Sequence, residues 1–266
     1  FTASSTLSTL TGPTQNGVGD LNGDGKMDIV VNHSGSAFVS VFLSENGAFP
    51  TRVDYAVASI AVSSNGIGNI GIADLNGDGK PDLAVPTNSG FSVLMNNGNG
   101  TFATKVDYSS SGADIALADL NGDGKADVVV GGGQNTNVYV RMNNGNGTFG
   151  TATTYSAGVS TLASALSVAD LNNDGAMDLA VQNTNGQTVS IFLNNGNGTF
   201  AAKVDYTSSD GYSMALTDVN GDGYVDVVAG MYSTPVTGGF AVLYNNGNGT
   251  FAPRVTFSNG ANGFAM

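Results

Sequence analysis

The stretch Asp20-Leu21-Asn22-Gly23-Asp24-Gly25-Lys26-Met27-Asp28 is the first of five copies of the pattern Asp-x-Asn-x-Asp-Gly-x-x-Asp in this chain of 266 residues. The other copies span residues 74–82, 119–127, 170–178 and 218–226. Side-chain oxygens at alternate positions, with a glycine that turns the chain sharply, are what a hard cation such as Ca²⁺ requires. A motif that returns every 45 to 54 residues also identifies a repeat protein, in which successive units share one core.

We predict that each loop binds one Ca²⁺, five in all, through four side chains and one backbone carbonyl. The side chains stand at the first, third, fifth and ninth positions, and the carbonyl belongs to the seventh. The predicted ligands are Asp20, Asn22, Asp24, Lys26 and Asp28; Asp74, Asn76, Asp78, Lys80 and Asp82; Asp119, Asn121, Asp123, Lys125 and Asp127; Asp170, Asn172, Asp174, Ala176 and Asp178; and Asp218, Asn220, Asp222, Tyr224 and Asp226. The seventh position holds Lys, Ala or Tyr, which fits a residue that contributes only its backbone.

The loops differ from an EF-hand, because their flanks read as strands and no bidentate Glu follows at the twelfth position. Acidic turns without metal are the alternative interpretation, although such turns need only one or two of these residues. A catalytic role is disfavoured because five near-identical sites suit a repeated structural element, whereas an active site is normally unique. We therefore expect the ions to be structural.

Two further phrases accompany the loops. Asn-Asn-Gly-Asn-Gly-Thr-Phe ends at Phe102, Phe149, Phe200 and Phe251, and a degenerate copy spans residues 44–49. Val-Asp-Tyr follows at residues 53–55, 106–108 and 204–206, with shorter remnants at 154–155 and 256–257. Between these phrases lie short runs rich in Val and Ile, bounded by Gly, Asn or Asp, and no run has helical periodicity. The sequence predicts an all-β protein of four-stranded antiparallel units, with the acidic loop joining the first strand to the second. Such units at this period are typical of a β-propeller.

These motifs resemble the FG-GAP/VCBS repeats of bacterial surface proteins and, more distantly, the blades of integrin α-subunit propellers and of a fungal propeller lectin. The resemblance covers nearly the whole chain and implies one Ca²⁺ in the first loop of each blade. We predict a single propeller domain over 1–266, with units at about 1–49, 50–102, 103–149, 150–200 and 201–251 and a partial unit at 252–266. Five blades are the favoured number. A longer propeller, or two chain ends that meet to patch a seam, are the alternatives, because residues 1–10 and 260–266 match single strands of further blades.

Composition excludes several classes of function. The formal net charge is −13, and five bound Ca²⁺ would offset ten of these charges, so the acidity is mainly an inventory of metal ligands. No basic patch favours nucleic acid, and no apolar run is long enough to insert in a membrane. The chain has no Cys and one His, His33, which the sequence places in a loop, so zinc or nucleophilic catalysis lacks material. We expect a secreted or cell-surface protein, bacterial in origin, because large extracellular proteins without disulfides are commoner in bacteria.

The leading hypothesis is an extracellular recognition or adhesion module that is not an enzyme and binds a protein or glycan. A calcium-dependent lectin is one alternative, with Tyr139, Arg141, Tyr212 and Tyr232 as residues that could contact a sugar. Against it, the chain has no Trp and lacks the Trp- and Arg-bearing segment that accompanies the sugar sites of the fungal lectin. An accessory domain of a polysaccharide-degrading enzyme is the other alternative. The Asn-Gly-Thr sequences at Asn99, Asn146, Asn197 and Asn248 are formal glycosylation sites that turn chemistry already explains.

Overall fold

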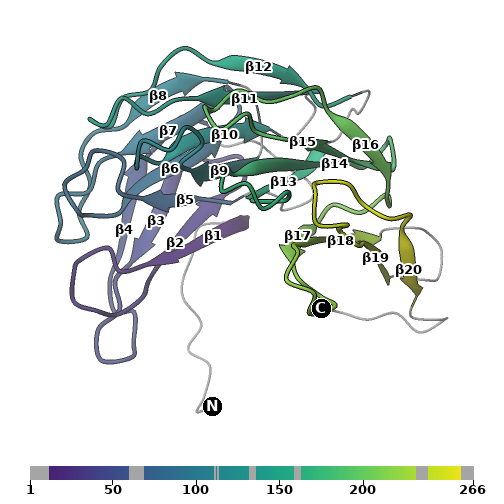
Figure 1. Cartoon of the computed structure of the whole chain (residues 1–266). Helices are drawn as coiled ribbons and strands as arrows, with labels where there is room; N and C mark the ends of the chain where they lie inside the picture. Colours follow the sequence, from purple (N-terminus) through teal and green to yellow (C-terminus); the bar gives the residue numbers. More distant parts are fainter. Residues whose placement is uncertain are drawn as a thin grey trace.

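The computed structural model describes residues 12–59, 69–110, 112, 114–131, 136–158, 163–231 and 239–258. Within these ranges all regular structure is β-strand, arranged as five four-stranded antiparallel sheets (Figure 1). The prediction of an all-β propeller of five four-stranded units is therefore confirmed. No helix in the described ranges is long and apolar enough to cross a membrane. The predicted strands at residues 1–10 and 260–266 lie outside the described residues.

Each sheet, or blade, is a simple meander in which neighbours in sequence pair in space. Blade 1 holds β1 (Pro13–Gly19), β2 (Asp28–His33), β3 (Phe38–Phe42) and β4 (Arg52–Ala56). Blade 2 holds β5 (Gly71–Ala73), β6 (Asp82–Thr87), β7 (Gly90–Leu94) and β8 (Val106–Ser109). Blade 3 holds β9 (Asp114–Ala118), β10 (Asp127–Gly131), β11 (Asn137–Arg141) and β12 (Thr153–Ser156). Blade 4 holds β13 (Ala163–Ala169), β14 (Asp178–Asn183), β15 (Thr188–Phe192) and β16 (Val204–Thr207). Blade 5 holds β17 (Met214–Thr217), β18 (Asp226–Met231), β19 (Gly239–Leu243) and β20 (Val255–Ser258).

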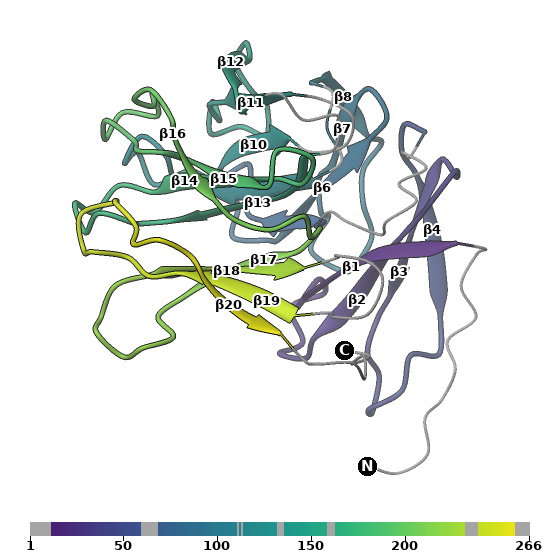
Figure 2. The same ribbon diagram turned by 90° about the vertical axis from the view of Figure 1, so that its right-hand side faces the viewer.

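The first strands of the blades lie at the centre of the molecule, and the blades fan out around them (Figures 1 and 2). Each first strand packs beside the next, from β1 through β5, β9 and β13 to β17. Glycine permits this close approach, because a Cβ on Gly71 would lie 2.8 Å from Leu117 of the neighbouring first strand. A Cβ on Gly17 would lie 2.9 Å from Ile72 in the same way. Small residues in these strands therefore allow the first strands of neighbouring blades to pack closely at the centre.

The described residues form four hydrophobic cores, and each core lies between two successive blades. The core between blades 2 and 3, for example, joins Phe91 and Val93 of β7 to Val128 and Val130 of β10. The other three cores join blades 1 and 2, blades 3 and 4, and blades 4 and 5. A single blade therefore has no core of its own, since its apolar faces are buried only when a neighbour covers them.

The two accompanying sequence phrases meet at the same blade boundaries. Tyr55 of β4 packs edge-on against Phe102 in the third-to-fourth-strand turn of blade 2, with ring centroids 5.2 Å apart. The pairs Tyr108–Phe149, Tyr155–Phe200 and Tyr206–Phe251 repeat this contact at 5.4, 5.4 and 5.2 Å. The Tyr of one blade thus always meets the Phe of the next, which explains why the two phrases recur together.

The units read from the motifs and the sheets of the structure are offset by one strand. A motif unit ends at the Phe of the turn, whereas the fourth strand of the same sheet follows that turn. Residues 50–102, for example, contain β4 of blade 1 as well as β5, β6 and β7 of blade 2.

Candidate metal-binding loops

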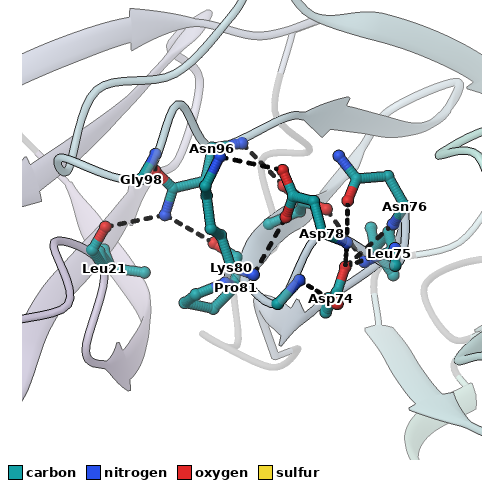
Figure 3. A network of polar contacts seen from close by, with 12 residues as sticks. Leu21, Asp74, Leu75, Asn76, Asp78, Lys80, Pro81, Asn96 and Gly98 are labelled. Atoms are coloured by element: carbon teal, nitrogen blue, oxygen red, sulfur yellow. Dashed lines mark hydrogen bonds and ion pairs between the residues drawn. The ribbon is translucent and has the colours of Figure 1, made fainter.

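The five acidic loops join the first strand of each blade to the second, as predicted. In the loop of blade 2, Asp74 accepts hydrogen bonds from the backbone N–H groups of Gly77 and Gly79, both at 2.7 Å (Figure 3). The side chain of Asn76 accepts from the N–H of Asp78 at 2.9 Å. The glycines at both places have φ near +80°, a conformation that a side chain disfavours. Loop winding is therefore encoded locally, by the first Asp, the Asn and the glycines.

The Asp at the fifth position of the loop has one of two side-chain partners, depending on the blade. In blades 1 to 3 it pairs with the Lys two residues later, as Asp78 does with Lys80 at 3.2 Å. The equivalent pairs are Lys26–Asp24 at 3.1 Å and Lys125–Asp123 at 2.9 Å. In blades 4 and 5, where the seventh residue is Ala or Tyr, the loop's own Asn donates to that Asp instead. The last two loops therefore carry three carboxylates without a lysine.

The ninth-position Asp lies beneath the loop and is fully buried in all five blades, at Asp28, Asp82, Asp127, Asp178 and Asp226. Asp82 accepts from the N–H of Leu75 at 2.9 Å and from the N–H of Asn96 at 2.7 Å. Burial raises the pKa of Asp82, these N–H donors oppose the shift, and the charges of Asp78 and Asp74 raise the pKa further. The pKa values of Asp127 and Asp178 are raised for the same reasons. In these blades the structure brings three carboxylates close enough to repel one another.

A buried Asn connects each of the last four loops to the loop of the preceding blade. The side-chain amide of Asn96 donates to the carbonyl of Leu21 at 2.8 Å and to the carbonyl of Pro81 at 2.9 Å (Figure 3). Asn143, Asn194 and Asn245 donate to Leu75, Leu120 and Leu171 in the same way. The sequence alone predicts only that this Asn lies in a hairpin turn. Its recurrence as the first residue of the Asn-Asn-Gly-Asn-Gly-Thr-Phe turn in four blades is the available signal, but the partner of Asn96 lies 75 residues away.

The donor chemistry of the loops fits a hard cation. Every predicted ligand offers oxygen, and a carboxylate oxygen that accepts one N–H keeps a second lone pair. As they stand, however, the carboxylates face the backbone N–H groups and the lysines. In the described ranges no group of three or more His, Cys, Asp or Glu side chains is arranged to hold a metal ion. The assignment of the twenty-five ligands to Ca²⁺ therefore remains a prediction.

The residues considered for sugar binding are partly committed to the fold. The guanidinium of Arg141 donates to the hydroxyl of Ser110 and to the carbonyls of Ser109 and Gly150, at 3.0, 2.6 and 2.6 Å. It also lies 5.8 Å from the ring centroid of Tyr108. Arg141 thus joins blades 2 and 3. Tyr139 lies on β11, Tyr212 lies in the segment before β17, and Tyr232 is outside the described residues.

The prediction that His33 lies in a loop is wrong, because it is the last residue of β2 and is fully buried. The strand extends further than expected because Asn32 and His33 are covered in the interior. Its Nε2 lies 2.9 Å from the Oγ of Ser40, which donates to Asp54 at 2.7 Å. Here the Ser stands between the His and the Asp, whereas a nucleophilic triad needs the His in the middle. Ser92–Asp107 and Ser190–Asp205 repeat the Ser–Asp pair in blades 2 and 4 without a His, so the pair belongs to the blade.

The sequons are turn elements, as expected from their chemistry. The side-chain oxygen of Asn99 accepts from both the backbone N–H and the hydroxyl of Thr101, at 3.1 and 2.6 Å. Asn146, Asn197 and Asn248 make the same pair of bonds in their own turns.

Comparison with protein families finds two family models that match the chain, one at four places and one at a single place. A family model described as FG-GAP-like repeat matches residues 20–85, 74–130, 119–181 and 179–229. A second model, described as FG-GAP repeat, matches residues 211–250. Together the matches span all five acidic loops.

Individual relatives share parts of this arrangement. Cartilage acidic protein 1 of Mus musculus is 39% identical over 85 residues, which is 29% of this chain and 13% of that protein. The present chain thus spans about an eighth of its length. An Agrocybe aegerita lectin that recognises non-reducing terminal N-acetylglucosamine superposes with a TM-score of 0.56 at 24% identity, over 92% of this chain and 65% of the lectin. The biofilm matrix protein Bap1 of V. cholerae superposes with a TM-score of 0.52 at 20% identity, over 92% of this chain and 40% of Bap1. At these identities the structures establish a shared fold.

Proposed function

The chain belongs to the FG-GAP-like repeat family, and from this premise we propose that it is an extracellular, calcium-stabilised propeller for recognition or adhesion, without catalytic activity. The observation that carries the proposal is the loop of three carboxylates, repeated in five blades with nearly the same hydrogen bonds. Such a set, with at most one lysine beside it, is relieved of its mutual repulsion by a divalent cation.

The place of the loops supports a structural role for the ion. The Leu that follows the first Asp is buried at Leu21, Leu75, Leu120 and Leu171, in the core shared with the next blade. Its carbonyl receives the Asn amide of that blade. An ion that stiffened the loop would therefore stiffen the joint between blades. Each loop would supply the ion with side-chain oxygens from its first, third, fifth and ninth residues and with the backbone carbonyl oxygen of its seventh residue.

Calcium binding is tested by titration and by thermal melting. Protein freed of metal and titrated with Ca²⁺ should take up about five ions per chain, and its melting temperature should rise with free Ca²⁺. At a free concentration one hundred times the Kd, each site adds about 2.7 kcal/mol to the free energy of unfolding. An unchanged melt in EDTA, with elemental analysis showing that the metal has gone, would refute the structural role.

Recognition of a glycan is the second candidate function, and the superposition on the Agrocybe aegerita lectin is the observation that favours it. A glycan array, probed with and without EDTA and including terminal N-acetylglucosamine, distinguishes the candidates. Calcium-dependent binding to one glycan class would support a lectin, whereas uniform silence would favour a protein ligand. Turnover of a polysaccharide by the purified chain would contradict the absence of catalysis. A role beside the catalytic domain of a polysaccharide-degrading enzyme would require such a domain in the same protein.

A further inference from the structure

Among the described residues, the face of blade 5 that points away from blade 4 is more exposed than the equivalent face of each other blade. The residue after the first loop Asp is 1% exposed in blades 1 to 4 but 46% exposed at Val219. The third-strand residue that pairs with the Tyr of the fourth strand is fully buried at Val39, Phe91, Val138 and Val189. Its equivalent in blade 5, Phe240, is 40% exposed. Val242, two residues further along β19, is buried.

The exposed aromatic pair of blade 5, Phe240 and Phe257, has nearly the same stacking geometry as a pair in blade 2 that a neighbouring blade covers. Phe240 stacks on Phe257 with ring centroids 4.9 Å apart and an interplanar angle of 16°. In blade 2, Phe91 stacks on Tyr108 at 5.0 Å and 13°. There, Phe149 from the turn of blade 3 packs edge-on against both rings, at 5.7 and 5.4 Å. Phe240 and Phe257 therefore form an exposed aromatic surface. In blade 2 the equivalent surface, Phe91 and Tyr108, is covered by Phe149 from the turn of the next blade.

The polar part of the boundary is open as well. The carbonyls of Leu21, Leu75, Leu120 and Leu171 each accept the side-chain amide of an Asn from the next blade. Among the described residues, none donates a hydrogen bond to the carbonyl of Val219, the fifth member of this series. Within the described ranges, this boundary thus combines a carbonyl that accepts no hydrogen bond with exposed apolar side chains.

Blade 1 is not built to fill this place. At the position of the bridging Asn it has Ser44, whose backbone N–H donates to Asp28 as that of Asn96 does to Asp82. Its turn is also shorter, with an isolated bridge between Glu45 and Ala48 where blade 2 has one between Asn96 and Phe102. Neither blade 1 of the same chain nor blade 1 of a second copy can therefore reproduce the bond from the Asn amide.

We propose that the outer face of blade 5, formed by Val219, Phe240 and Phe257, is a docking surface for a further FG-GAP-like blade that carries the Asn-Asn-Gly-Asn-Gly-Thr-Phe turn. The Asn amide of that turn bonds the carbonyl of Val219, and its Phe packs edge-on against Phe240 and Phe257. This interface continues the series of four that the chain already contains.

The test appends a blade to the full chain and measures the cover at Phe240. A copy of residues 208–258, which is the unit that starts after β16 and ends with β20, is inserted after Ser258, so that residues 259–266 of the chain are kept. The chain has no Trp, so Phe240→Trp in the original blade 5 is a single fluorescent reporter. We expect the appended blade to shift the Trp emission to the blue and to slow its quenching by acrylamide about fivefold or more. A second fusion, with residues 157–207 from the fourth blade's unit, guards against failure of the first to fold.

The control fusion carries Asn245→Ala and Phe251→Ala in the appended copy only, and its Trp should remain as accessible as in the chain without a fusion. Equal quenching with and without either appended blade would overturn the proposal. So would a Trp already shielded in the monomeric original chain, since other residues would then cover the face. A Trp shielded in a dimer and exposed on dilution would assign the face to a second copy and would also overturn it.

Discussion

The side-chain amide of Asn96 donates a 2.8 Å hydrogen bond to the backbone carbonyl of Leu21, across the boundary between the first two blades. The same Asn donates to the carbonyl of Pro81 in its own loop, and its backbone N–H donates to the buried Asp82. One residue therefore ties the loop of its own blade to the loop of the preceding blade. Because this arrangement recurs at three further boundaries, the acidic loops are parts of the joints between blades.

Replacing the bridging Asn should weaken a joint without touching an acidic side chain. In Asn143→Ala the half-buried carbonyl of Ala126 loses its side-chain donor, and the buried carbonyl of Leu75 keeps only the N–H of Gly147. We expect a loss of about 2–3 kcal/mol in the free energy of unfolding, measured by urea denaturation. The matched control is Asn144→Ala, whose exposed side chain donates to the hydroxyl of Thr148 and should cost less than about 0.5 kcal/mol. Equal losses in the two variants would contradict the bridging role.

Stability should depend on pH through Asp114, which lies at the start of β9 and joins three blades. Its carboxylate accepts from the N–H groups of Asn69, Ile115 and Leu166, each at 2.9 Å. Burial raises the pKa of Asp114 to about 6, against the effect of these donors. Because the folded state holds the proton more tightly than the unfolded state, the stabilising contribution is complete below pH 3.8 and is lost as the pH rises through about 6. The full change is about 3 kcal/mol.

Urea denaturation in EDTA from pH 4 to 8 measures this dependence. Asp114→Asn should remove that part of the decline, while the raised pKa values of Asp82, Asp127 and Asp178 act equally in both proteins. The variant should also be less stable by about 1–3 kcal/mol, because an amide NH₂ group would face a backbone N–H. Identical pH profiles for the two proteins would exclude Asp114 as the source.

Removing the loop lysines should strengthen cation binding if the loops hold Ca²⁺. Lys26, Lys80 and Lys125 each pair with the fifth-position Asp, which is one of the predicted ligands. Their replacement by Ala removes a competing positive charge and should lower the calorimetric Kd for Ca²⁺ at low salt by about three- to tenfold in blades 1 to 3. Lys105→Ala is the control, because Lys105 pairs with Asp107 on β8, outside the loops. If Lys105→Ala lowered the Kd for Ca²⁺ by the same factor, the effect would come from the net charge of the protein and not from the loop lysines.

Two glycines should respond differently to substitution. Gly77 has a φ of +80°, and the equivalent residue of blade 4 is Asn173, with a φ of 59°. Gly77→Asn should therefore change the free energy of unfolding by less than about 1 kcal/mol. At Gly90 a Cβ would lie 1.8 Å from the carbonyl oxygen of Tyr108 in the paired strand, so Gly90→Ala should cost about 4 kcal/mol or more. Thermal melting of both variants measures the difference, and a mild effect at Gly90 would contradict the described β7–β8 pairing.

Much of the fold follows from the sequence because its determinants are local. The glycines with positive φ, the Asp and Asn that accept from nearby N–H groups, and the short β-branched runs act within a few residues of one another. They suffice to predict strands, hairpins and the place of each acidic loop. Repetition of the pattern then predicts that equivalent segments take equivalent places, which gives the blades and their number.

The tertiary structure decided what distant residues do for one another. The sequence places Asn96 in a turn, yet only the packing of blade 2 on blade 1 brings its amide to the carbonyl of Leu21. Burial likewise distinguishes Phe91 from Phe240, which occupy equivalent places in β7 and β19. Blade 3 covers Phe91, whereas Phe240 is 40% exposed. The motifs of a repeat act within one unit, whereas cover, desolvation and hydrogen bonds between blades depend on which unit stands beside it.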